Sequence, residues 1–352
     1  MMRVDDAERQ GRVAAALRLM EEMPDGPDGR RFWRPWRVER LVQLRLFRPS
    51  MPSWAHSRWL LEQALQHYDA RTADISRRAW STALRVRGGH EALREAYPVD
   101  AATKLIDHDW VYRQCHLYDL GGLATFLRTA ASPDLVRRAD DVRQWARTPM
   151  GGYLLVARGS ATTTFEDLAD GRPFETPNIG SAALLAPGEH VIGRLVPFTS
   201  GRVFESVPLQ VPEELARSVA RDPSSWLTEL EETIRQAPIP LHFHRFGFIS
   251  DLPADIAAAA LHDSDDFSSA AIARTLVRTV DTALRGELDW GDEDVDPWAC
   301  FASLIQTPTI LHALANEPLA SDAKVITRLG LRLAEPSAQI CRDLADALRQ
   351  AA

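Results

Sequence analysis

Apolar residues recur at helical spacing along most of the chain. Near the N-terminus, Val13, Leu17 and Met20 fall on one face of a predicted helix, three to four positions apart. From residue 38 to residue 147 the same spacing dominates, and its clearest apolar stripe runs from Leu60 to Tyr68. The chain before residue 150 is therefore predicted to be mainly α-helical.

Between residues 151 and 211 the pattern changes to short apolar runs separated by turn signals. The first run is 153–157, and Asp170-Gly171 predicts a hairpin between two of the runs that follow. Pro187-Gly188 predicts a second hairpin, and Ser200-Gly201 predicts a further turn. About five or six short strands in so few residues form a small antiparallel sheet or a partly closed barrel.

Helical signals return after residue 211. A capping residue followed by proline at 222–223, 296–297 and 307–308 is typical of a helix start. We therefore predict an α+β fold, with mainly helical N-terminal and C-terminal regions around the small sheet or barrel. A sheet of this size is stable only when it packs on the helices.

Four segments follow from these changes of pattern. Residues 1–29 form an N-terminal helix and a linker, because the segment 24–29 combines two prolines with two glycines. A basic helical domain spans 30–150, a small antiparallel β module spans 151–211, and an acidic helical domain spans 212–352.

The net charge of −8 hides an uneven distribution. Residues 30–149 hold 21 Lys and Arg against 13 Asp and Glu, whereas residues 150–352 hold 16 against 29. One explanation is that the basic part faces an anionic partner. The other is that the two halves neutralise each other, within one chain or across a homodimer.

Arginine and tryptophan alternate early in the basic segment, and this pattern gives the candidate contact surface. Interleaved guanidinium and indole groups suit phosphates with stacked bases, or an acidic protein surface. The alternative is that the indoles pack between helices while the arginine stems cover them. The predicted partner-binding residues are Arg31, Trp33, Arg34, Trp36, Arg37, Arg45, Arg48 and Arg58.

A second candidate site lies in an aromatic, proline-flanked stretch that is extended in character. On a strand, His242 and His244 would point to the same side, so both could bind one divalent metal ion. A metal enzyme needs at least one more ligand, which the spacing does not identify. The alternative is that both histidines are polar positions on a half-buried strand.

Motifs of other enzyme classes are missing from the sequence. It contains no Gly-x-x-x-x-Gly-Lys-Ser/Thr, Gly-x-Gly-x-x-Gly, Gly-x-Ser-x-Gly or His-Glu-x-x-His. We therefore expect a non-enzymatic binding or adaptor protein without a cofactor, which contacts an acidic protein surface or nucleic acid through the Arg/Trp-rich face. The alternative is a metal-dependent enzyme with its site near His242 and His244.

The sequence also carries expectations about location. No apolar run approaches the roughly 18 to 20 residues of a membrane span, and the N-terminus lacks the apolar stretch of a secretory signal. Cys115, Cys300 and Cys341 lie far apart, which excludes a disulfide scaffold. We expect a cytoplasmic protein with no membrane partner.

Overall fold

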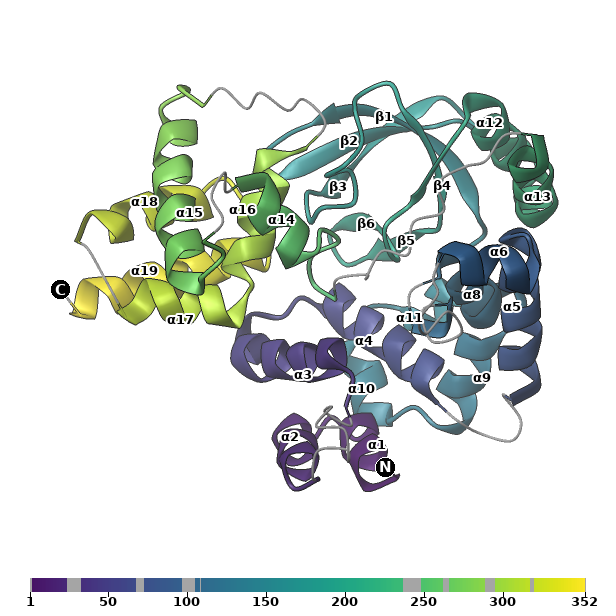
Figure 1. Ribbon diagram of the computed structural model, residues 1–352, viewed down its shortest axis with the longest axis horizontal. Coiled ribbons are helices and arrows are strands. Elements are labelled where there is room, and N and C mark those ends of the chain that lie inside the picture. Colours follow the sequence, from purple (N-terminus) through teal and green to yellow (C-terminus); the bar gives the residue numbers. More distant parts are fainter. Residues whose placement is uncertain are drawn as a thin grey trace.

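The computed structural model describes residues 2–23, 33–67, 73–96, 105–107, 109–236, 248–261, 266–288, 295–316 and 320–351. Helices flank a small antiparallel sheet (Figure 1), so the predicted α+β class is confirmed. The helices are α1 (Met2–Arg9), α2 (Val13–Glu21), α3 (Pro35–Phe47), α4 (Ser53–Gln66), α5 (Ala73–Val86), α6 (Gly89–Ala96), α8 (Trp110–Gln114), α9 (Gly122–Thr129), α10 (Pro133–Arg138), α11 (Val142–Trp145), α12 (Glu213–Arg221), α13 (Trp226–Gln236), α14 (Ala254–Leu261), α15 (Ser269–Leu284), α16 (Pro297–Ile305), α17 (Pro308–Asn316), α18 (Ala320–Gly330) and α19 (Ser337–Ala351).

The sheet has five antiparallel strands in the order β3-β2-β1-β4-β7. Tyr153 on the central strand lies opposite Asp167 of β2 and Val191 of β4. A separate two-stranded sheet pairs β5 with β6, and the larger sheet is open rather than a partly closed barrel. The strands are β1 (Gly151–Arg158), β2 (Thr162–Asp167), β3 (Arg172–Pro177), β4 (His190–Gly193), β5 (Leu195–Phe198), β6 (Gly201–Phe204) and β7 (Leu209–Val211).

Two local predictions differ from the structure. The predicted N-terminal helix is two helices, because Gly11 between α1 and α2 adopts a φ of 69°, which favours glycine. The hairpin predicted at Pro187-Gly188 lacks its first strand, because residues 181–184 form a turn and the next two residues belong to no strand. After that turn, the second arm of the predicted hairpin divides at Arg194 into β4 and β5, which belong to different sheets. Arg194 is buried and donates to the side chains of Gln114 and Asp119.

One helix packs closely across the sheet. A Cβ atom added to Gly152 of β1 would lie 1.9 Å from the carbonyl oxygen of Ala216 in α12. The missing side chain therefore lets the helix backbone approach the strand backbone.

The main apolar core draws on all four predicted segments. Val4, Trp59, Val203 and Phe301 belong to one cluster of buried side chains, and each comes from a different segment. The segments therefore pack together, and the four-domain division stays a prediction. In Figure 1 the C-terminal helices α14 to α19 gather on one side of the sheet, and α3 and α4 lie below it.

Candidate functional site

The predicted aromatic contact surface is largely internal. Trp33 is 8% exposed, and its neighbours Trp54 and Trp59 are each 2% exposed. Trp36 is half-buried, and its indole is hydrogen-bonded to the carboxylate of Asp107. The indole of Trp33 thus fills space between helices, and its contact with a partner stays a prediction.

Two of the predicted contact arginines are also internal. Arg37 pairs with Glu8 and Asp5 of α1, at 2.6 Å to each, and Arg58 pairs with Asp251 at 2.7 Å. A guanidinium that leaves water needs an opposite charge close by, and both arginines have one. Arg37 and Arg58 thus belong to the architecture of the chain rather than to an open surface.

Several ion pairs join the basic and acidic halves of the chain. Arg58 reaches Asp251, and Arg85 of α5 pairs with Glu231 of α13 at 2.7 Å. Arg113 pairs with Glu205, which also accepts from the amide of Gln114. These contacts favour the explanation in which the halves neutralise each other within one chain.

The remaining predicted residues lie at different places. Arg34 is exposed and lies 3.3 Å from Asp107. Arg31, His242 and His244 lie outside the described residues, so the metal site and the metal-dependent enzyme stay predictions. Among the residues that are described, no group of three or more His, Cys, Asp or Glu side chains could hold a metal ion.

Arg45 and Arg48 line an open hollow of about 470 Å³ on the helices α2 and α3. Arg12 and Arg18 line the same hollow, and all four side chains are exposed. None of the four forms an ion pair with a carboxylate in the described ranges. We call this hollow the arginine groove. Its apolar lining includes Val13, Ala14, Ala15 and Leu44.

Sequence reasoning found only half of this groove. Arg12 and Arg18 precede the predicted linker, in a segment where acidic residues outnumber basic ones. Only the packing of α2 against α3 brings them beside Arg45 and Arg48. Their spacing of six positions, which is not a helical neighbour spacing, gave no sign of a shared site.

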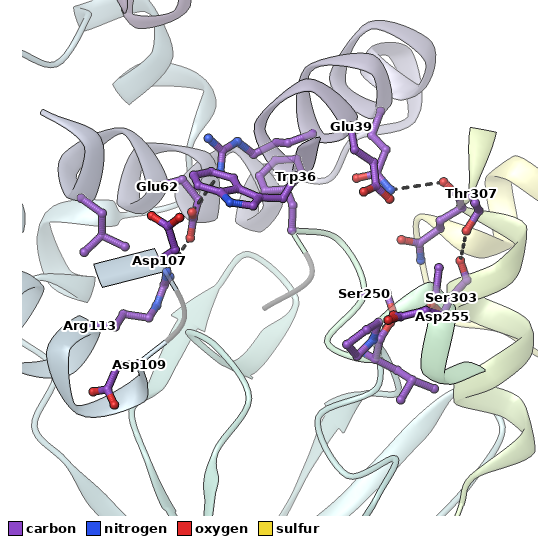
Figure 2. Close-up of a pocket in the computed structure, with 18 of the residues that line it drawn as sticks. Trp36, Glu39, Glu62, Asp107, Asp109, Arg113, Ser250, Asp255, Ser303 and Thr307 are labelled. Atoms are coloured by element: carbon purple, nitrogen blue, oxygen red, sulfur yellow. Dashed lines mark hydrogen bonds and ion pairs between the residues drawn. The ribbon is translucent and has the colours of Figure 1, made fainter. Parts of the chain in front are cut away.

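A second pocket, of about 350 Å³, lies between two walls (Figure 2). The first wall comprises side chains of α3, α4 and α8 together with Ile106, Asp107 and Asp109. The second comprises side chains of the loop 248–253, α14 and the end of α16. In Figure 2, Glu62 and Asp107 belong to the first wall, and Ser250 and Asp255 to the second. We call this the interface pocket. Its walls come from parts of the chain so far apart that no sequence motif could have indicated it.

The acidic groups of the first wall have different environments. Burial favours a raised pKa for Glu62, but the guanidinium groups of Arg113 and Arg40 outweigh burial and hold its pKa below the usual value. Burial raises the pKa of Asp107 against the opposing effect of Arg34. The pocket is therefore lined both by Glu62, whose carboxylate stays ionised, and by Asp107, whose carboxyl group is protonated more easily.

The cysteines do not have the environment of reactive nucleophiles. Cys115, Cys300 and Cys341 are free and buried. Burial raises the pKa of Cys300 and Cys341 to about 12, and it raises that of Cys115 as well. A thiol with such a pKa is protonated at neutral pH and is a poor nucleophile.

Comparison with known proteins finds no matching family model, no matching curated protein and no matching solved structure. In the part of the chain that the structure describes, no helix has the length and apolar character to cross a membrane.

Proposed function

We propose that the protein is a non-enzymatic binding or adaptor protein whose arginine groove holds an acidic segment of a partner protein. The observation that carries the proposal is the set of four exposed arginines around one hollow, without carboxylate partners among the described residues. Like charges held close together repel, and an anionic partner relieves that repulsion. Guanidinium groups also match the planar geometry of carboxylates.

The lining of the groove favours a protein segment over nucleic acid. The accessible side chains of Ala14 and Ala15 give it an apolar part, which an acidic amphipathic segment can cover and a phosphate backbone cannot. Single-stranded nucleic acid needs accessible rings on which bases stack. Phe47, Trp54 and Trp59 are buried, and Trp36 lines the interface pocket instead.

Fluorescence anisotropy with a labelled Glu/Leu-rich peptide tests the proposal. We expect the variant Arg45→Glu/Arg48→Glu to bind the peptide about tenfold or more weakly than the unmodified chain. The matched control is Arg77→Glu/Arg78→Glu on α5, which reverses two exposed arginines away from the groove and should leave binding unchanged.

Two outcomes would overturn the proposal. One is an equal loss of peptide binding in both variants, which would indicate a general charge effect. The other is tighter binding of a labelled oligonucleotide than of the peptide, with an affinity that falls steeply as salt is raised, which would identify nucleic acid as the partner.

A further inference from the structure

The interface pocket differs in charge from the arginine groove and is independent of the proposed function. Its lining includes five carboxylate side chains and two guanidinium groups, those of Arg40 and Arg113. Four of the carboxylates lie on the first wall and one, that of Asp255, lies on the second. Glu62, Asp107 and Asp109 are each paired with an arginine, whereas Asp255 forms no ion pair with a described residue.

The donors on the first wall are mostly committed within the protein. Arg40 donates to Glu62 at 2.9 Å, and Arg113 donates to the same carboxylate. The indole of Trp36 is bonded to Asp107, and the side-chain amide of Gln43 donates to a backbone carbonyl at 3.3 Å. The Nε atom of Arg40 is an exception, since it is buried without an acceptor in the described part of the chain.

The hydroxyl groups of the second wall are committed in the same way. Ser303 and Ser250 each donate to the carbonyl of Leu252, at 2.7 and 3.1 Å. Thr307 donates to the carbonyl of Ser303 at 3.2 Å. Because each hydroxyl has a single hydrogen, these oxygens can offer only lone pairs to a bound molecule.

Gln306, which also lines the pocket, adds an acceptor that is buried. Its side chain is 1% exposed, and its Nε2 lies 2.6 Å from the hydroxyl oxygen of Ser337. That hydroxyl gives its hydrogen to the carbonyl of Ala302 at 3.2 Å, so it accepts from Gln306. The amide oxygen Oε1 of Gln306 is thereby left without a partner among the described residues.

From this arrangement we infer that the interface pocket binds a small organic cation that carries ammonium or guanidinium groups. The unpaired carboxylate of Asp255 and the unused amide oxygen of Gln306 need a ligand that supplies positive charge and N–H donors. A bare metal ion fits less well, because the described carboxylates do not gather in a group that could hold one. A volume of about 350 Å³ suits a small organic molecule.

Asp255 is the most informative residue to substitute. It is exposed, lies in the first turn of α14, and forms no ion pair with any described residue. Asp255→Asn therefore removes a charge from the pocket without breaking an internal pair. Glu214→Gln is the matched control, since Glu214 is an exposed carboxylate in the first turn of α12.

Isothermal titration calorimetry with putrescine and agmatine tests the inference on the full chain. We expect at least one of the two cations to bind, and butane-1,4-diol, the uncharged analogue of putrescine, not to bind. Asp255→Asn should weaken binding by about fivefold, and Glu214→Gln should not. Ala254→Trp, which places a bulky ring at the pocket edge on α14, should abolish binding while the unfolding temperature stays unchanged.

The inference is overturned if neither cation binds, if butane-1,4-diol binds as well as putrescine, or if both carboxylate variants behave alike. Tighter binding of Mg²⁺ or Ca²⁺, with loss of that binding in Asp255→Asn, would also overturn it by making the pocket a metal site. None of these results bears on the arginine groove, which is tested with a peptide.

Discussion

The guanidinium group of Arg58 and the carboxylate of Asp251 meet at two points inside the protein. Nη1 lies 2.7 Å from Oδ1, and Nη2 lies 3.2 Å from Oδ2. Arg58 also donates to the carbonyl of Phe204, and Asp251 accepts from the hydroxyl of Ser181. Four distant parts of the chain thus meet at one buried ion pair.

Breaking this pair should destabilise the fold strongly. Asp251→Ala leaves the Arg58 guanidinium buried without its carboxylate, and we expect a loss of about 3–5 kcal/mol in the free energy of unfolding. Urea denaturation at neutral pH measures this. The control is Asp74→Ala, which removes the partner of the exposed Arg77 and should cost less than about 1 kcal/mol. Similar losses in the two variants would contradict the structural role of the Arg58–Asp251 pair.

The stability should depend on pH through His116. Its ring is fully buried beside Ser76, and burial lowers its pKa from 6.5 to about 4. In the unfolded chain His116 binds a proton as the pH falls through about 6.5, whereas in the folded chain it stays neutral until the pH falls to about 4. Stability contributed by the neutral ring is present above pH 6.5 and is lost as the pH falls towards 4, by about 3 kcal/mol at most.

Denaturation of the unmodified chain and of His116→Gln at several pH values tests this prediction. Buried carboxyl groups with raised pKa values, such as Asp109, act in the opposite direction, so only the difference between the two proteins is informative. We expect the difference in unfolding free energy to change between pH 6.5 and 4. Parallel curves for the two proteins would refute it.

Gly152 should not tolerate a methyl group. In Gly152→Ala the new Cβ would meet the carbonyl oxygen of Ala216, so α12 must move away from β1. We expect a loss of about 2 kcal/mol or more in unfolding free energy. Gly171→Ala is a useful comparison, because its Cβ meets nothing within 4 Å and only its φ of 69° opposes alanine, at about 1 kcal/mol. A smaller loss at Gly152 than at Gly171 would mean that the helix yields easily.

Local signals were sufficient for much of the fold. The carboxylate of Asp296 accepts from the backbone N–H of Trp298, so the predicted start of α16 is confirmed together with its cap. The turn at Asp170-Gly171 joins β2 and β3 as an antiparallel pair. Such features depend on residues a few positions apart, and the sequence therefore reveals them.

The candidate sites depend on distant residues, and there the sequence was less informative. Nothing near Arg37 shows that Glu8, on another helix, lies 2.6 Å away, and nothing near Arg45 shows that Arg12 shares its hollow. An arginine that pairs internally and one that stays open look alike in sequence. Only packing, which decides the distance to the nearest carboxylate, separates them.

The three buried cysteines can report on local opening of the structure. All three sulfurs are buried, so an alkylating reagent can reach each one only when the surrounding helices separate. The raised pKa values of the thiols also slow the reaction in the closed state. Cys115 lies in the core around α5 and α8, whereas Cys300 and Cys341 lie among the C-terminal helices. The order in which they are labelled in the native state would therefore show whether the core around α5 and α8 or the C-terminal helices open more often.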